Sequence, residues 1–222
     1  MSVATTVATT RHPSRHELLA DCIIHIMGVA GGTIGGATLV ALIAARGDWL
    51  ELGALLVYAL GMIAMFCCSA AYNLARNSPR RAVLRRCDHA AIFVMIAGTY
   101  TPFTVLRLDG AWSWGLTSAV WVIAAAGLLV RLLRPCDLSL ASVMPYLLLG
   151  WIGIIAIDPL FHSLGWEPLA LIGLGGALYT VGVGFHIWER LPFQNAIWHA
   201  FVLAAASAHY AAVVTSIVLR SA

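Results

Sequence analysis

The sequence predicts an all-α polytopic membrane protein, and three observations support this fold class. Hydrophobic residues make up 61% of the 222 residues, charged residues make up 10%, and the mean hydropathy is +0.88. A water-soluble domain has roughly a quarter of its residues charged. Seven apolar windows have about the 20 residues that a membrane helix needs. None shows the period-2 alternation of a β-barrel, and unpaired backbone groups are costly in lipid, so each window is predicted to be helical.

The predicted helices follow one another with short polar breaks. They cover residues 18–45, 51–73, 88–106, 112–133, 141–158, 169–188 and 195–218. The first contains the stretch GVAGGTIGG, which favours close packing against a neighbouring helix. Residues 1–16 are polar and rich in threonine, so we expect a disordered cytoplasmic tail there. Residues 17–222 are expected to form one transmembrane domain.

The basic residues predict the orientation of the bundle. All 13 are arginines, and all but Arg46, Arg107 and Arg220 lie on the cytoplasmic side if the N-terminus does. Because short loops that are rich in arginine stay inside, we expect the N-terminus in the cytoplasm and the C-terminus outside. The expected location is the cell (inner or plasma) membrane. Membrane lipids are the expected partners, since the basic loop between helices two and three faces anionic headgroups. Binding of nucleic acid is not expected.

Polar and ionisable side chains gather at the predicted cytoplasmic ends of five helices. Glu17, Asp21 and His25 are four residues apart and share one helix face. The others are Asn73 at the end of the second helix, Asp88 and His89 at the start of the third, His186 at the end of the sixth, and Asn195 and His199 at the start of the seventh. Such groups in a membrane usually mark a pathway, a metal or a catalytic site. An interhelical hydrogen-bond network, or a location at headgroup level, is the alternative interpretation.

Four segments carry a resemblance to a known family. They are ELLADCIIH (17–25), SAAYN (69–73), RRCDHAAIFVMIAGTYTPF (85–103) and NAIWHAFVLAAASAHY (195–210). In this order they resemble the hemolysin III proteins of the progestin and adipoQ receptor superfamily. The resemblance implies seven transmembrane helices, a zinc site near the cytoplasmic face and a lipid-accessible cavity. It also implies kinship with membrane-embedded hydrolases such as alkaline ceramidases, although bacterial members are commonly labelled hemolysin or channel-like.

The sequence departs from the family at the implied zinc ligands. The resemblance implies a histidine at the end of helix two and a His-x-x-x-His pair at the start of helix seven. Asn73 and Asn195 replace two of these three histidines, and His199 remains. Asp88 resembles the carboxylate that holds the zinc-bound water in the family. Because an amide oxygen is a poor zinc ligand, we expect zinc, the candidate cofactor, to bind more weakly than in the family pattern.

Three interpretations remain open, and the first is an enzyme. His199 and His25, with His186 as a further candidate ligand, would hold a metal. Asp88 would be the general base in hydrolysis of a lipid amide or ester. Glu17, Asp21, His89 and His209 would form a supporting polar network.

The other two interpretations need no metal. Asn73, Asn195, His199 and Asp88 could form a hydrogen-bonded plug in a lipid-binding or regulatory protein. Alternatively, the polar row could relay protons or ions toward His209, which lies about 15 Å beyond His199 at 1.5 Å per residue. Beyond His209 the last helix offers few polar side chains, so a pore is the least favoured interpretation.

Overall fold

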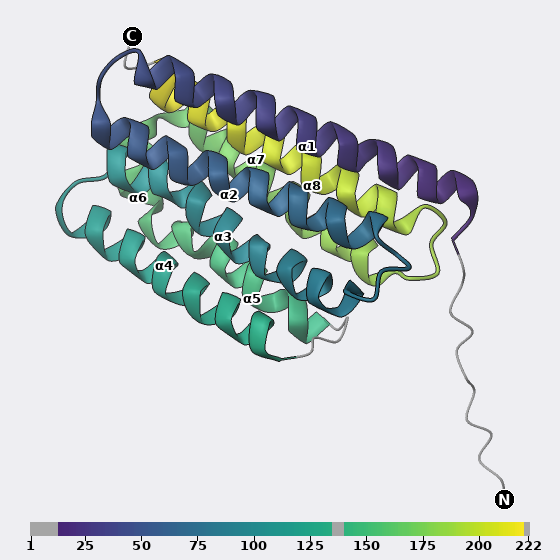
Figure 1. Cartoon of the computed structure of the whole chain (residues 1–222). Helices are drawn as coiled ribbons and strands as arrows, with labels where there is room; N and C mark the ends of the chain where they lie inside the picture. The colour runs from purple at the N-terminus through teal and green to yellow at the C-terminus, as the bar shows by residue number, and fades with distance from the viewer. Residues whose placement is uncertain (1–12, 135–139, 220–222) are drawn as a thin grey trace, which may run out of the picture.

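The computed structural model describes residues 13–134 and 140–219 and shows a bundle of long helices lying side by side (Figure 1). Within these residues, seven helical spans are long and apolar enough to cross a membrane, and no strand occurs. The predicted fold class is therefore confirmed. The chain is an all-α, multi-pass membrane protein.

The seven spans keep the predicted order. They are α1 (Arg15–Ala44), α2 (Trp49–Leu74), α3 (Arg81–Arg107), α4 (Gly110–Leu133), a composite fifth span, α7 (Trp166–Ile187), and α8 (Gln194–Val213) continued by the π-helix η2 (Val214–Val218). The fifth span consists of α5 (Leu140–Trp151), the 3-10 helix η1 (Ile152–Ala156) and α6 (Ile157–Leu164).

The start of α1 differs from the prediction because Ser14 caps the helix. Arg15 and His16, predicted to belong to the tail, are already helical. The Ser14 hydroxyl accepts a hydrogen bond from the Glu17 backbone N–H (3.3 Å), and the Glu17 carboxylate accepts one from the Ser14 N–H (2.8 Å). This reciprocal pair is a capping box, which stabilises a helix start. Residues 1–12 of the tail predicted for residues 1–16 lie outside the described residues.

The fifth span is longer than predicted, because part of the polar break after residue 158 is helix. Leu160 and Leu164 of α6 are buried, whereas Asp158 and His162 are exposed. This amphipathic spacing continues the span after the 3-10 segment. The helix ends at Gly165, whose φ of 74° is in the left-handed region that glycine adopts easily.

Glycines bring α1 close to its neighbours, as predicted for the GVAGGTIGG stretch. A Cβ at Gly28 would lie 2.7 Å from the Phe66 ring of α2. A Cβ at Gly35 would lie 3.1 Å from Tyr210 of α8, whose hydroxyl donates to the Gly35 carbonyl (3.2 Å). α1 therefore contacts both α2 and α8, although these helices are far apart in sequence.

The remaining helices complete the bundle. α3 packs between α2 and α4, α7 packs on α8, and the composite span contacts α3, α4 and α7. The described chain ends, Pro13 and Leu219, lie at opposite ends of the bundle (Figure 1). We call these ends the Arg15 end, where α1 begins, and the Ala44 end, where α1 finishes.

Two arginines hold the last turn of the chain at the Ala44 end. Arg46 donates to the Val218 carbonyl (2.8 Å), and Arg107 donates to the Ser216 carbonyl. Cations are favourable at the end of a helix, where carbonyl groups lack intrahelical partners. These arginines therefore stabilise the end of the last span.

Candidate metal centre

Three ionisable side chains meet near the Arg15 end, namely Asp21 and His25 of α1 and His199 of α8. Asp21 Oδ1 lies 2.6 Å from Nδ1 of His199 and 3.6 Å from Nδ1 of His25. The two imidazole rings are 4.3 Å apart. One potential ligand atom from each residue lies within 4.8 Å of the other two. Among the described residues, this is the group of histidine, cysteine and acidic side chains that could hold a metal ion.

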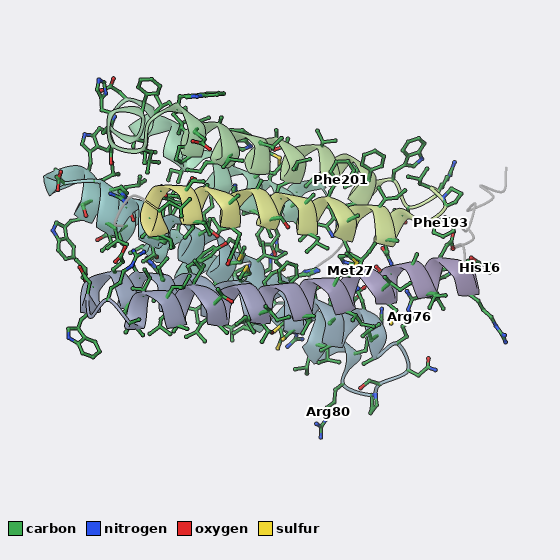
Figure 2. The ribbon with its side chains drawn as sticks, turned by 90° about the horizontal axis from the view of Figure 1, so that it is seen from above. His16, Met27, Arg76, Arg80, Phe193 and Phe201 are labelled. Atoms are coloured by element: carbon green, nitrogen blue, oxygen red, sulfur yellow. The ribbon has the colours of Figure 1, made fainter. Side chains whose placement is uncertain are left out.

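Local helix geometry and close packing explain the convergence. Asp21 and His25 are four residues apart on one face of α1, and both are buried. α8 lies against α1, which brings half-buried His199 to this face. Figure 2 shows α1 and α8 running alongside each other, with His16 and Phe193 at the same end. The spacing of Asp21 and His25 could be seen in the sequence, whereas the position of His199 beside them depends on the contact between α1 and α8.

His25 is held from two sides. Its Nδ1 lies 2.8 Å from the Asp21 backbone carbonyl, and its Nε2 lies 3.3 Å from the Ser69 hydroxyl of α2. Nδ1 is therefore placed to donate to the carbonyl, and Nε2 faces Ser69. The orientation of the ring is fixed before any ligand arrives.

Asp88 of α3 adjoins the three-residue group. It lines the same cavity as Ser69 and His199 and is close enough for both side chains to influence its carboxylate. Because the Ser69 hydroxyl also contacts His25 Nε2 (3.3 Å), the predicted general base lies beside the candidate ligands.

A cavity of about 270 Å³ begins at this polar group. Ser69, Asp88 and His199 line one end of it, together with His89 and His186. Farther along it is lined largely by apolar side chains of α3, the composite span, α7 and α8, such as Ile96, Phe103, Leu160 and Leu169. An apolar cavity with polar groups gathered at one end suits a ligand with a polar head and a hydrocarbon chain.

A smaller polar cleft of about 100 Å³ lies on the other side of the group. It is lined by Glu17, Asp21, Arg76, Glu189 and Asn195, among others. Arg76 and Phe193, which also lines the cleft, are labelled at this end of the bundle in Figure 2. Asp21 lines the cleft, whereas its partner His199 lines the cavity. The hydrogen bond between them therefore joins a residue of the cleft to a residue of the cavity.

The structure groups the candidate ligands differently from the sequence prediction. His25 and His199 come together, but the third member is Asp21, predicted only as part of a supporting network. His186 lies outside the group because its ring packs against Trp198, with centroids 4.9 Å apart. Its buried Nδ1 has no hydrogen-bond partner among the described residues. His89 lines the cavity, and its backbone carbonyl accepts from Tyr146 (3.2 Å).

The two asparagines differ in their contacts. The Asn73 amide donates to the Ser69 carbonyl of its own helix (3.0 Å) and lies 3.5 Å from the Ser69 hydroxyl, which also contacts His25. Asn195 lies one turn before His199 and lines the polar cleft. Within the described part of the chain, hydrogen bonds join Asn73 to the group through Ser69, whereas none joins Asn195 to Asp88 or His199.

Glu17 and His209 make contacts of a structural kind. The Glu17 carboxylate accepts from the Phe193 backbone N–H (2.9 Å), in addition to capping α1. Phe193 has a φ of 59° where α8 begins, so Glu17 holds a strained turn in place. His209 Nε2 lies 3.2 Å from the Ile172 carbonyl. The described hydrogen bonds do not extend from His199 to His209, as a relay would require.

Sequence comparison identifies the family. The family model described as "Haemolysin-III related" matches residues 14–210. The chain is 34% identical over 194 residues to the hemolysin-3 homolog of Bacillus subtilis (strain 168), covering 87% of this chain and 91% of that protein. It is 33% identical over 187 residues to hemolysin-3 of Bacillus cereus, with 84% and 85% covered. It is 28% identical over 207 residues to the human monocyte to macrophage differentiation factor, with 90% and 84% covered. The predicted resemblance is confirmed, and the chain belongs to the haemolysin-III related family.

Proposed function

We propose that the chain is a metal-assisted hydrolase of membrane-lipid amides or esters, acting in membrane-lipid homeostasis. One observation carries the proposal: Asp21, His25 and His199 converge at the polar end of an apolar cavity. Two imidazoles and a carboxylate are a donor set that catalytic zinc sites use, with three protein ligands and one open position. The set differs from the family pattern, since Asp21 and His25 accompany His199 in place of histidines at 73 and 195.

The three side chains fit a metal ion. Asp21 and His25 are buried, and the ligand atoms are mutually within 4.8 Å. The contact of His25 Nδ1 with a backbone carbonyl is typical of metal-binding histidines, whose second nitrogen then binds the ion. The short hydrogen bond between Asp21 and His199 shares a proton between two potential ligand atoms. An ion would take the place of that proton.

The chain's own residues supply the rest of the chemistry. When bound, zinc would polarise the scissile carbonyl and favour deprotonation of water. Asp88 would accept a proton from the attacking water while the water oxygen bonds to the carbonyl carbon. The same residue would return the proton to the leaving amine or alcohol as the C–N or C–O bond breaks. Ser69, which lines the cavity with Asp88, would help to orient it, the cavity would take the acyl chain, and the polar cleft would admit water.

Metal content is the first test of this proposal. Elemental mass spectrometry of detergent-purified protein should find about one metal ion per chain in the wild type. His199→Ala should lose it. His209→Ala is the matched control, because His209 is on the same helix and lines the opposite part of the same cavity. Loss in both variants, or retention in both by folded protein, would contradict the assigned ligands.

Lipid turnover is the second test. Asp88→Asn should retain the metal but lose turnover of lipid amides or esters by about 10²-fold or more, as expected for removal of a general base. Lipid profiles of cells that express wild type or Asp88→Asn would identify the substrate. Equal profiles, with metal bound in both proteins, would remove the catalytic role of Asp88.

A metal-free lipid-binding protein is the second candidate, and one observation favours it. Asp21, His25, His199 and Ser69 already satisfy one another by hydrogen bonds and close contacts. Polar groups satisfied in this way are stable in an apolar surrounding without an ion. Wild-type protein without metal that still retains lipid would select this function over hydrolysis.

The orientation remains a prediction, and the arginines at the Arg15 end support it. Arg76 and Arg80 lie between α2 and α3 at this end, Arg81 begins α3, and Arg190 lies between α7 and α8. Basic residues in short loops stay in the cytoplasm. A cysteine introduced at Ser78 should be labelled by a membrane-impermeant thiol reagent only after the cells are opened. Labelling in intact cells would reverse the orientation.

A further inference from the structure

We infer that the cavity selects lipids by the length of their hydrocarbon chain, and that Gly173 of α7 sets the depth of the cavity. This inference rests on the proposed lipid-directed function and specifies the chain length of the ligand. Three features of the cavity support it: its length along two helices, the hydrogen bonding of its polar groups, and the open space at Gly173.

Two helices give the same length for the cavity. On α3 its lining runs from Asp88 to Thr104, sixteen positions apart, which is about 24 Å at 1.5 Å per residue. On α7 it runs from His186 to Leu169, seventeen positions apart, or about 25 Å. An extended chain advances about 1.2 Å per bond, from the 3.3–3.6 Å of a three-bond residue. The cavity therefore holds a chain of about 18 to 20 carbons.

The deep part of the cavity presents few free polar groups. The hydroxyls of Thr99 and Tyr100 donate to the carbonyls of Met95 (2.8 Å) and Gly150 (2.6 Å). The Thr104 hydroxyl donates to the Tyr100 carbonyl (3.2 Å). His209 is bonded to the Ile172 carbonyl. Because backbone carbonyls occupy these groups, the deep part suits hydrocarbon, and the polar head of a lipid belongs beside Asp88 and His199.

Gly173 leaves space near the deep end. It lines the cavity and is half-buried, yet a Cβ built on it would meet nothing within 4 Å. At Gly176, one turn nearer the polar end, a Cβ would already lie 3.1 Å from Trp151. A side chain at 173 would therefore project into the cavity without displacing a neighbour.

The length of chain that a side chain at 173 would exclude follows from the helix. Gly173 lies thirteen positions from His186, or about 20 Å, and the cavity continues one turn farther to Leu169. Side chains tilt toward the N-terminus of their helix, which for α7 is the deep end of the cavity. A leucine at 173 would fill this last turn and exclude about four carbons.

Gly184 provides a matched control on the same helix. A Cβ there also meets nothing within 4 Å, but Gly184 is exposed and does not line the cavity. Gly184→Leu makes the same chemical change and gives the same gain in helix propensity as Gly173→Leu. The two variants differ in whether the leucine enters the cavity.

The test measures binding of saturated fatty acids, from decanoic to eicosanoic acid, to purified full-length protein by displacement of a fluorescent fatty acid. Wild type and Gly184→Leu should bind octadecanoic or eicosanoic acid most tightly. Gly173→Leu should prefer chains about four carbons shorter. It should bind the longest at least about tenfold more weakly, since each buried CH₂ contributes about 0.8 kcal/mol. Gly173→Ala, a smaller change, should give an intermediate shift.

The outcomes separate this inference from the proposed function. A preferred length that is equal in all four proteins, or absent from the wild type, would overturn it. Folded Gly173→Leu that binds no chain at all would also overturn it, because a shorter chain must still fit. A shift seen in protein without metal or turnover would refute hydrolysis and support the chain-length inference. Turnover without any length preference would do the opposite.

Discussion

Two Asp-x-x-x-His pairs in this protein have nearly the same local geometry but opposite surroundings. Asp21–His25 on α1 and Asp158–His162 on α6 both place the imidazole Nδ1 3.6 Å from the aspartate Oδ1. In both, Nδ1 also contacts the aspartate's backbone carbonyl, at 2.8 Å and 2.9 Å. The first pair has side chains only 4% exposed, whereas those of the second are 74% and 84% exposed.

The two pairs differ because a second helix packs against only the first of them. α8 places His199 against the first pair, which makes a group of three potential ligands beside a cavity. The second pair faces outward at the Ala44 end. The four-residue spacing within one helix therefore places an aspartate beside a histidine. Packing against a second helix is what makes such a pair a candidate metal site.

The largest effect is expected from removing the buried carboxylate. Asp21→Ala leaves two imidazoles without the oxygen that both approach, so metal affinity should fall by more than about 100-fold. Asp158→Ala removes the same group from the exposed pair and should leave metal content unchanged. Elemental analysis after dialysis against a chelator measures both. Equal metal content in the two variants would mean that the buried pair has no special role.

Separating α1 from α2 should weaken the site indirectly. Leucine at Gly28 would overlap the buried Phe66 ring, and overpacking of this kind costs about 1–3 kcal/mol. Gly31→Leu is the control, because a Cβ at Gly31 meets nothing within 4 Å. Thermal unfolding in detergent should show a lower Tm for Gly28→Leu alone, together with partial loss of metal. A normal Tm would show that close glycine packing is not needed.

Replacing Glu17 should lower the stability of the fold without affecting the metal site. Glu17→Ala removes the capping box of α1 and the acceptor of the Phe193 N–H. Stability should fall by about 1–2 kcal/mol, as for loss of a helix cap. Metal content should stay near the wild-type value, because Glu17 lies outside the group of three. Metal loss at unchanged Tm would instead make Glu17 part of the site.

The smallest effect is expected at the exposed pair. His162→Ala removes an exposed partner whose ion pair with Asp158 is screened by solvent, so the free energy of unfolding should change by no more than about 0.5 kcal/mol. His25→Ala, the same change in the buried pair, should release the metal. If His162→Ala lowered metal content, the comparison between the pairs would fail.

The sequence predicted the helical spans and the end at which polar groups meet. Apolar length determines the spans, and the four-residue spacing of Asp21 and His25 determines their shared face. The Ser14-x-x-Glu17 capping signature was also present in the sequence and would have corrected the start of α1. These features depend on one helix at a time, which is why the sequence was sufficient.

The grouping of the candidate ligands could not be predicted, because it depends on contacts between helices. Asp21 reaches His199 because α1 packs against α8. His186 has the same chemistry as His199, but its ring packs against Trp198. The cavity is also a property of several helices, and the open space at Gly173 has no signal in the sequence.

The hydrogen bond between Asp21 and His199 joins a residue of the polar cleft to a residue of the apolar cavity. In the proposed hydrolysis, water could therefore reach the centre from the cleft while a lipid fills the cavity. A lipid analogue that fills the cavity would then compete with other lipids but leave the exchange of small solutes at the centre unchanged.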